Sequence, residues 1–207
     1  MDNLCHSLVG AALGEAGLKK RTALATATLV IGANLPDVDV FSYFWGADTA
    51  LGFRRGWTHG VLALVIWPFV LTGIMMLWDR FVRRRRRAAA EPARPDALLL
   101  LSAVSVLTHP FLDWLNTYGM RWLMPFRDVW SYGDVLFIMD PWIWLVLGTG
   151  WLASRQLSRR GSHGAERPAR AALVVVSLYI LVLWVGRLAA VEVARKGMGS
   201  GESPPAA

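Results

Sequence analysis

Apolar residues along this chain are gathered into long runs, which polar and charged stretches separate. A helix needs about 20 residues to cross a membrane. Three runs are long enough, at residues 60–78, 97–115 and 171–193. A fourth run, at about 135–153, contains one interruption, Asp140-Pro141. The pattern predicts four long transmembrane-type helices.

Two shorter apolar segments, residues 4–17 and 22–35, precede the long runs and are separated by a basic triplet that begins at Lys19. At about 1.5 Å per helical residue, each segment reaches only about 20 Å. We expect short tilted membrane helices or a hairpin packed against the long ones. The predicted fold class is therefore an all-α integral membrane bundle. Residues 1–193 would form its single membrane-embedded domain, and residues 194–207 a disordered tail.

The composition supports a membrane protein. Hydrophobic residues make up 55% of the chain and charged residues 18%, whereas soluble domains have about 45–50% and 25%. The single cysteine, Cys5, excludes a disulfide scaffold and a cysteine-rich zinc site. The net charge of +7 would fit a nucleic-acid partner, but the basic residues cluster beside apolar runs, as topology signals do. Membrane lipid, and no nucleic acid, is the expected partner.

The basic clusters also predict an orientation. Most of the 22 basic residues lie at or near three stretches, 19–21, 83–94 and 155–170. If all six segments cross the membrane, these stretches lie on one side, which the positive-inside rule makes the cytoplasm. The chain is then a multi-pass protein of the cytoplasmic (inner) membrane. Residues 36–58 and 116–134 would face the outside or periplasm.

The second long run, residues 97–115, contains an ionisable pair, His109 and Asp113. Each such group inside a membrane segment costs roughly 2.5–3.5 kcal/mol and is a functional candidate by default. The spacing of four residues places both side chains on one helical face. By itself, the pair is explained better by a buried hydrogen bond that satisfies two core polar groups than by a metal site.

Other ionisable residues are expected at the same depth. With alternating crossings, six of them fall within about 10 Å of one membrane face, namely His6, Asp37, His59, His109, Asp113 and Asp140. Imidazole and carboxylate ligands together suit zinc, manganese or iron. The joint pattern predicts a site for one or two divalent metal ions, with zinc preferred. The fourth histidine, His163, lies in a basic loop and is expected to be solvated.

Four ordered motifs resemble the YdjM-like family of membrane-bound metal-dependent hydrolases, also described as LexA-regulated. The resemblance covers roughly residues 1–150. The motifs are the His6 segment, Gly32-Ala-Asn-Leu-Pro-Asp37-Val-Asp39, Arg55-Gly-Trp-Thr-His59-Gly and His109-Pro-Phe-Leu-Asp113-Trp-Leu-Asn-Thr-Tyr118-Gly. The layout is more loosely similar to the helical zinc-dependent phospholipase C clan. That clan has more histidines, which argues against a full three-zinc cluster here.

The resemblance implies roles for particular residues. The implied metal ligands are His6, Asp37, His59, His109 and Asp113. Asp39 is a ligand, an orienter of a histidine or the general base, and is the candidate catalytic residue. Arg54 or Arg55 would hold an anionic phosphate or carboxylate. The remaining expected substrate contacts are Asn116, Tyr118, Asp134 and Asp140.

The function expected from these residues is hydrolysis by metal-activated water. The substrate would be an ester or phosphoester, either a lipid or a small molecule, at the membrane interface. The main alternative is a divalent-cation or proton transporter, because intramembrane His and Asp also line ion pathways. A transporter needs polar groups near the midplane, so a one-sided layer favours the hydrolase. A third possibility is a metal that only staples helices together.

Overall fold

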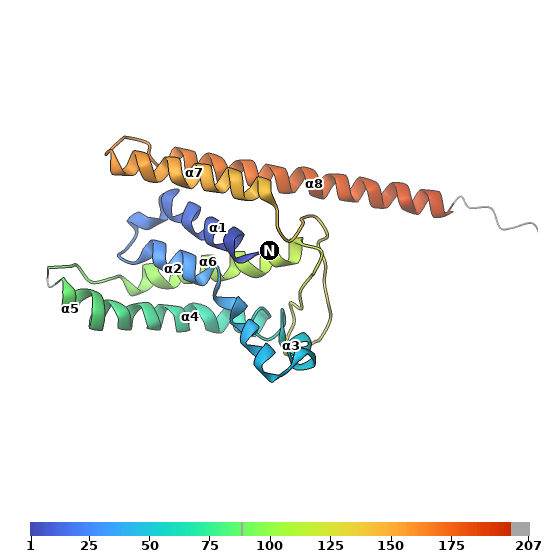
Figure 1. The fold of residues 1–207 in the computed structure, drawn as a ribbon, viewed down its shortest axis with the longest axis horizontal. Helices are drawn as coiled ribbons and strands as arrows, with labels where there is room; N and C mark the ends of the chain where they lie inside the picture. The colour runs from blue at the N-terminus through green and yellow to red at the C-terminus, as the bar shows by residue number, and fades with distance from the viewer. Residues whose placement is uncertain (88, 200–207) are drawn as a thin grey trace, which may run out of the picture.

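The computed structural model describes residues 1–87 and 89–199, which form an all-helical structure with two isolated β-bridges (Figure 1). The helices over these residues are α1 (Asn3–Glu15), α2 (Ala25–Gly32), α3 (Ala47–Phe53), α4 (Val61–Trp78), α5 (Arg84–Arg86), α6 (Pro95–Leu115), α7 (Pro141–Arg159) and α8 (Arg167–Gly199). Two 3-10 helices, η1 (Leu18–Lys20) and η2 (Leu35–Trp45), and a π-helical turn, η3 (Asp79–Arg83), complete the order.

Three helical segments are long and apolar enough to cross a membrane, namely Val61–Arg86, Pro95–Leu115 and Arg167–Lys196. The middle one, α6, has its apolar residues largely buried, whereas α4 and α8 leave most of theirs exposed. Exposed apolar faces of this size on long helices fit contact with lipid. The structure therefore supports a helical membrane protein with α6 at its centre.

The fourth predicted helix begins later than the sequence pattern suggested. Residues 135–140 are not helical, and α7 starts at Pro141. The carboxylate of Asp140 accepts hydrogen bonds from the backbone N–H groups of Trp142 and Ile143, and proline is favoured at a first helical position. The Asp140-Pro141 pair is thus the start of the helix and not an interruption within it. By length and composition, α7 is not among the candidate spans found in the described residues.

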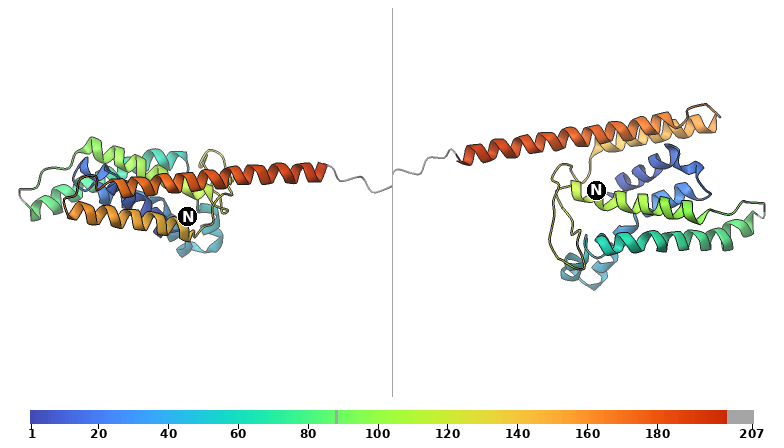
Figure 2. Two further views of the ribbon diagram at one scale, coloured as in Figure 1. Left: turned by 90° about the horizontal axis from the view of Figure 1, so that it is seen from above. Right: turned by 180° about the vertical axis from the view of Figure 1, so that it is seen from behind.

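The two short N-terminal segments form the α1–α2 hairpin. This hairpin lies between the α7–α8 pair and the α4–α6 pair in both side views (Figures 1 and 2). Its close packing depends on two glycines. A Cβ at Gly10 would lie 2.6 Å from the carbonyl oxygen of Leu29, and a Cβ at Gly32 would overlap Ser105 and lie 3.0 Å from Leu71. Glycine at these positions lets α1 approach α2, and α2 approach α6.

The two ends of the bundle differ in charge. One end holds η1, α5 and the turn between α7 and α8, where most basic residues lie (Figure 1). The carboxylates of Glu15 and Asp79 pair there with Lys19 and Arg83. The other end holds the N-terminus, η2, α3 and the loop from 116 to 140 (Figure 1). The predicted basic stretches therefore share one end of the bundle.

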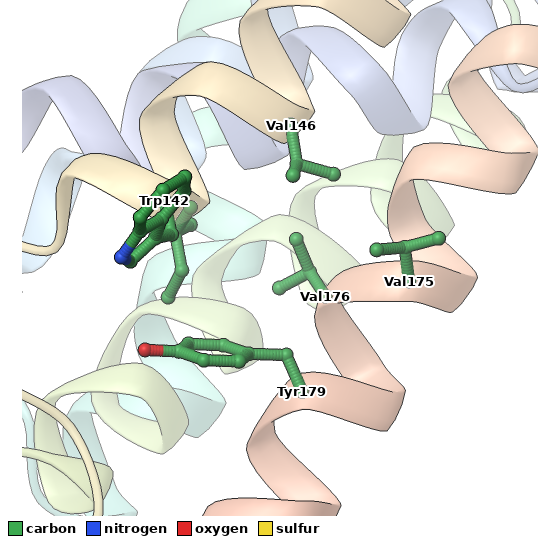
Figure 3. A pocket seen from close by; sticks show the side chains of 6 residues that line it. Trp142, Val146, Val175, Val176 and Tyr179 are labelled. Carbon is green, nitrogen blue, oxygen red and sulfur yellow. The ribbon is translucent and has the colours of Figure 1, made fainter.

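Helices α7 and α8 pack side by side and leave an apolar groove between them (Figure 3). The groove is lined by Trp142, Ile143, Val146, Val175, Val176 and Tyr179. The hydroxyl of Tyr179 donates a hydrogen bond to Asp140 at 3.0 Å. Helix α8 continues through Gly199, so the first residues of the predicted tail are helical. The rest of that tail, residues 200–207, lies outside the described residues.

The close approach at Gly10 predicts a stability difference between two Gly→Ala variants. Both variants gain about 1 kcal/mol of helix propensity, but only Gly10→Ala places a methyl group against the α2 backbone, whereas a Cβ at Gly148 meets nothing within 4 Å. Gly10→Ala should be less stable than Gly148→Ala by about 1–3 kcal/mol. Unfolding of the detergent-solubilised protein in mixed micelles, followed by circular dichroism, measures this. Equal stability would contradict the packing described.

Candidate metal centre

Four side chains from three parts of the fold converge at the less basic end of the bundle. Asp37 comes from η2, His59 lies just before α4, and His109 and Asp113 lie one turn apart on α6. One ligand atom from each lies within 4.8 Å of the others. The side chains of His59, His109 and Asp113 are fully buried, whereas that of Asp37 is 15% exposed. Solvent therefore reaches the cluster on the side of Asp37, because the other three side chains are buried.

The spacing of the ligand atoms fits a single small cation. The Nε2 atoms of His59 and His109 lie 3.1 Å apart. The Oδ2 atom of Asp113 lies 3.5 Å from the first and 3.4 Å from the second. The Oδ1 atom of Asp37 lies 3.9 and 3.6 Å from the same two nitrogens. Tetrahedral zinc with bonds of about 2.0–2.1 Å separates its ligand atoms by about 3.3 Å.

Hydrogen bonds on the far side of each imidazole fix which nitrogen faces the cluster. The Nδ1–H of His109 donates to the carbonyl of Ala33 at 2.6 Å. The Nδ1 of His59 lies 2.9 Å from the Thr58 hydroxyl, which donates in turn to Asp39 at 3.3 Å. With both Nδ1 atoms bonded in this way, each Nε2 atom is turned toward the cluster and can bind a cation there, as in metal-bound histidines. Two imidazole nitrogens and two carboxylates this close together repel one another unless a proton or a metal ion lies among them.

Among the described residues, the buried Oδ2 of Asp113 has no hydrogen-bond partner. Buried carboxylate oxygens without partners are costly and rare in native structures. The oxygen is surrounded by His59 Nε2, His109 Nε2 and Arg55 Nε at 3.3–3.5 Å. All three are near it, but none is placed to donate a hydrogen bond to it. A metal ion bound among these atoms would satisfy the oxygen.

The two ligands outside the candidate membrane spans have pKa values that suit metal binding. Burial lowers the pKa of His59, so its imidazole is neutral at neutral pH. Burial alone would raise the pKa of the Asp37 carboxyl, but contact with His109 outweighs burial and lowers this pKa from 3.8 to about 2. A neutral imidazole and an ionised carboxylate are the forms that bind metals.

His6, which the family resemblance implies as a ligand, lies against the cluster but outside the four-atom group. Its Nε2 is 3.3 Å from Oδ1 of Asp113, the oxygen that the Met1 ammonium also contacts. Its ring stacks on that of His109, with centroids 3.8 Å apart. In this arrangement His6 holds the outer oxygen of Asp113 and the ring of His109.

Asp39 faces the outer side of the His59 ring and not the four ligand atoms of the cluster. Its Oδ2 lies 3.4 Å from Nδ1 of His59, on the side away from the other ligands. The same oxygen accepts the backbone N–H of Arg55 at 2.9 Å. Of the roles considered for Asp39 from the sequence, this geometry favours the orienter of a histidine.

The two arginines lie at different depths. Arg55 is buried beside Asp113, with its Nε 3.3 Å from Oδ2. Arg54 is 23% exposed, contacts the Tyr43 hydroxyl at 3.3 Å and lies 3.5 Å from Asp39. A buried guanidinium offsets the negative charge of the cluster. Arg54, which is partly exposed, is better placed than Arg55 to reach a substrate anion.

Two of the other predicted substrate contacts are joined to Arg55. The Oδ1 of Asn116 accepts from its guanidinium at 3.2 Å, and the ring of Tyr118 lies 4.5 Å beneath that guanidinium. Asp140 caps α7 and bonds Tyr179, as described above, and Asp134 is exposed in the loop before α7. Among the described residues, neither of these two aspartates belongs to the metal-ligating group.

Sequence reasoning missed two supporting groups. The Thr58 hydroxyl precedes His59 directly, and a hydroxyl beside a candidate ligand is a signal that can be read from sequence. The Ala33 carbonyl carries no sequence signal, because every residue has one and only the fold brings it to His109.

Fold and cluster together define a helical membrane protein with a one-sided His/Asp centre. The family model for the YdjM inner membrane protein matches residues 1–190. The chain therefore belongs to the YdjM inner membrane protein family, as the sequence motifs predicted.

A curated relative is similar to most of the chain. The uncharacterized protein YfhP of Bacillus subtilis (strain 168) is 25% identical over 157 residues, which is 70% of this chain and 43% of that protein. The chain thus spans less than half of the length of this relative. No solved structure matches the chain.

The geometry predicts that metal content depends on the α6 pair. Because His109 and Asp113 act together, His109→Ala or Asp113→Ala should lower metal occupancy by at least about tenfold. The matched control is His163→Ala, which removes the histidine outside the cluster and should keep full occupancy. Elemental analysis of protein purified without chelator measures this, and circular dichroism checks the fold. Full occupancy in folded α6 variants would show that the four residues do not form the site.

Proposed function

We propose that this chain is a membrane-bound hydrolase that uses one divalent metal ion, preferably zinc, on an ester or phosphoester bond. The observation that carries the proposal is the convergence of two imidazole Nε2 atoms and two carboxylates at a cluster whose edge, Asp37, is 15% exposed. The donor set suits zinc, manganese or iron, and the spacing suits the short bonds of zinc. Among the described residues one such group is found, which supports one ion over two.

When bound, zinc supplies a water molecule acidic enough to attack at neutral pH. The residues of the chain position the reaction around it. Asp39 and Thr58 fix the tautomer and ring plane of His59. Ala33 does the same for His109. Arg54, at the exposed edge, is placed to bind an anionic oxygen of the substrate, whereas Arg55 balances the charge of Asp113.

The position of the cluster favours hydrolysis over transport. An ion path needs polar groups between the two faces of a membrane. The buried carboxylates at the opposite end, Glu15 and Asp79, are already paired with Lys19 and Arg83. The partial exposure of Asp37 also favours an open site over a closed structural one.

We further propose a multi-pass arrangement with the site facing the outside of the inner membrane. The basic stretches at η1, α5 and the α7–α8 turn lie at the end opposite to the cluster (Figure 1). Basic residues are retained on the cytoplasmic side. The site would then open toward the periplasm.

The contacts of Asp39 predict a loss of activity without a loss of metal. Asp39→Asn removes the negative charge behind His59 but no atom of the four-ligand group. Hydrolysis of bis(p-nitrophenyl) phosphate should fall by about 100-fold in kcat, while zinc content stays unchanged. Asp96→Asn, an exposed change at the basic end, is the control and should retain activity. Loss of zinc in Asp39→Asn would make Asp39 a ligand, and unchanged turnover would remove it from the mechanism.

The proposed orientation predicts a labelling pattern on intact cells. In a Cys5→Ala background, Arg127→Cys places a thiol in the exposed loop at the cluster end, and Ser162→Cys places one in the α7–α8 turn. An impermeant maleimide should label the first directly and the second only after permeabilisation. The reverse pattern would contradict the orientation. Direct labelling of both would contradict a crossing of the membrane by α7, the helix that lies between the two positions.

A further inference from the structure

An apolar groove lies directly beside the candidate metal centre. Its walls come from η2, α3 and the first turns of α4, and its volume is about 530 Å³. Pockets of 300–1,000 Å³ are the usual size for small ligands. Six side chains that form its walls are Val38, Phe41, Trp45, Phe53, Thr58 and Trp67. We refer to it as the η2–α4 groove.

The groove and the metal centre share their supporting residues. Val38 follows the ligand Asp37, and Thr58 precedes the ligand His59. The indole N–H of Trp67 donates to the carbonyl of Thr58 at 3.0 Å. The hydroxyl of the same Thr58 lies 2.9 Å from the His59 ring. A molecule in the groove would therefore contact Thr58, whose hydroxyl is bonded to the ring of the candidate ligand His59.

The groove also lies at membrane depth. Trp67 is six residues beyond the start of α4, which is about 9 Å along the helix. The surface of α4 is apolar from its first turn, with Val61, Leu62, Val65 and Ile66 exposed. Around the groove, Phe44 is 83% exposed and Trp45 is 72% exposed. Exposed aromatic side chains next to a membrane helix are typical of the lipid headgroup layer.

The positive charge of Arg54, beside the groove, is suited to the anionic headgroup of a lipid. Arg54 follows the wall residue Phe53 and is 23% exposed; its Nε is buried 3.5 Å from Asp39, and its NH1 donates to the Tyr43 hydroxyl. An apolar groove at membrane depth with a cationic group at its end matches an amphiphile. The chain of such a molecule would fill the groove, and its polar linkage would lie toward Asp37.

We propose that the η2–α4 groove binds an acyl chain of a membrane lipid, and that the substrate is an anionic lipid whose ester or phosphoester bond lies at the metal centre. This substrate assignment rests on the proposed hydrolase function. The lipid would enter from the bilayer past the aromatic rim, so that neither its chain nor its head has to leave the interface.

The groove of Figure 3 does not compete for this role. It lies between α7 and α8, and none of its six lining residues is a neighbour in sequence of a metal ligand. The polar group joined to it, Asp140, is occupied in capping α7.

The binding test uses the full chain in vesicles of phosphatidylethanolamine and phosphatidylglycerol. The probe is a phosphatidylglycerol with a photoreactive diazirine on its acyl chain, present in trace amount. Thr49→Trp fills the groove, because Thr49 also lines it. Leu51→Trp is the matched control, because Leu51 lies on the same helix, is 60% exposed and is not a lining residue.

Wild type and Leu51→Trp should be labelled within residues 37–53, and Thr49→Trp should lose that labelling by roughly tenfold. Mass spectrometry of the cross-linked peptides measures the labelling, and metal content checks that each variant keeps its centre. Labelling that Thr49→Trp leaves unchanged, or its absence from wild type, would overturn the lipid assignment.

A second measurement separates this inference from the hydrolase proposal. Alkyl p-nitrophenyl phosphodiesters of increasing chain length should show a falling KM with wild type, and Thr49→Trp should remove that trend. Groove labelling without hydrolysis of any ester would support the lipid site and contradict the hydrolase. Hydrolysis with neither labelling nor chain-length dependence would support the hydrolase and contradict the lipid site.

Discussion

The buried carboxylate of Asp113 is the interaction on which the rest of the structure depends. A charge removed from water inside a helical bundle is strongly unfavourable unless its neighbours compensate for it. The compensation here comes from three parts of the chain. His6 and the Met1 ammonium contact one oxygen, Arg55 lies beside the other, and His59 and His109 lie close enough to that second oxygen to share a cation with it. The N-terminal helix, the segment before α4 and helix α6 are therefore brought together at one point. An uncompensated carboxylate would favour their separation.

The rest of the bundle is arranged around this polar point with apolar contacts. Buried side chains from α1, α6, α7 and α8 form one cluster, and those from α2, α4 and α6 form smaller ones. The outward sides of α4 and α8 remain apolar and exposed. In a membrane, those sides meet lipid, which satisfies them without further protein. The few buried polar groups can then determine how the helices are positioned, because the remaining helix contacts are apolar and less specific.

Much of this organisation can be predicted from the sequence, and the exceptions have physical causes. The i, i+4 spacing of His109 and Asp113 predicts their shared face, and the alternation of apolar runs predicts that Asp37 and His59 lie at the same end. The role of Asp39 could not be chosen from sequence. In a 3-10 helix of three residues per turn, the side chains of residues two apart point about 120° away from each other. Asp37 and Asp39 therefore face different partners once η2 forms, and nothing in the residue pattern specifies a 3-10 helix there.

The tight packing at Gly32 makes the metal centre sensitive to a residue that carries no functional group. Gly32 precedes Ala33, whose carbonyl holds His109, and Ser105, the residue it packs against, lies one turn before His109 on α6. A single methyl group at position 32 would push α2 away from α6 and so separate that carbonyl from the imidazole. Such a variant would keep every ligand, every charge and every hydrogen-bonding side chain. An assessment of natural variants based on those groups alone would class it as harmless, although it would act on the tautomer of a candidate metal ligand.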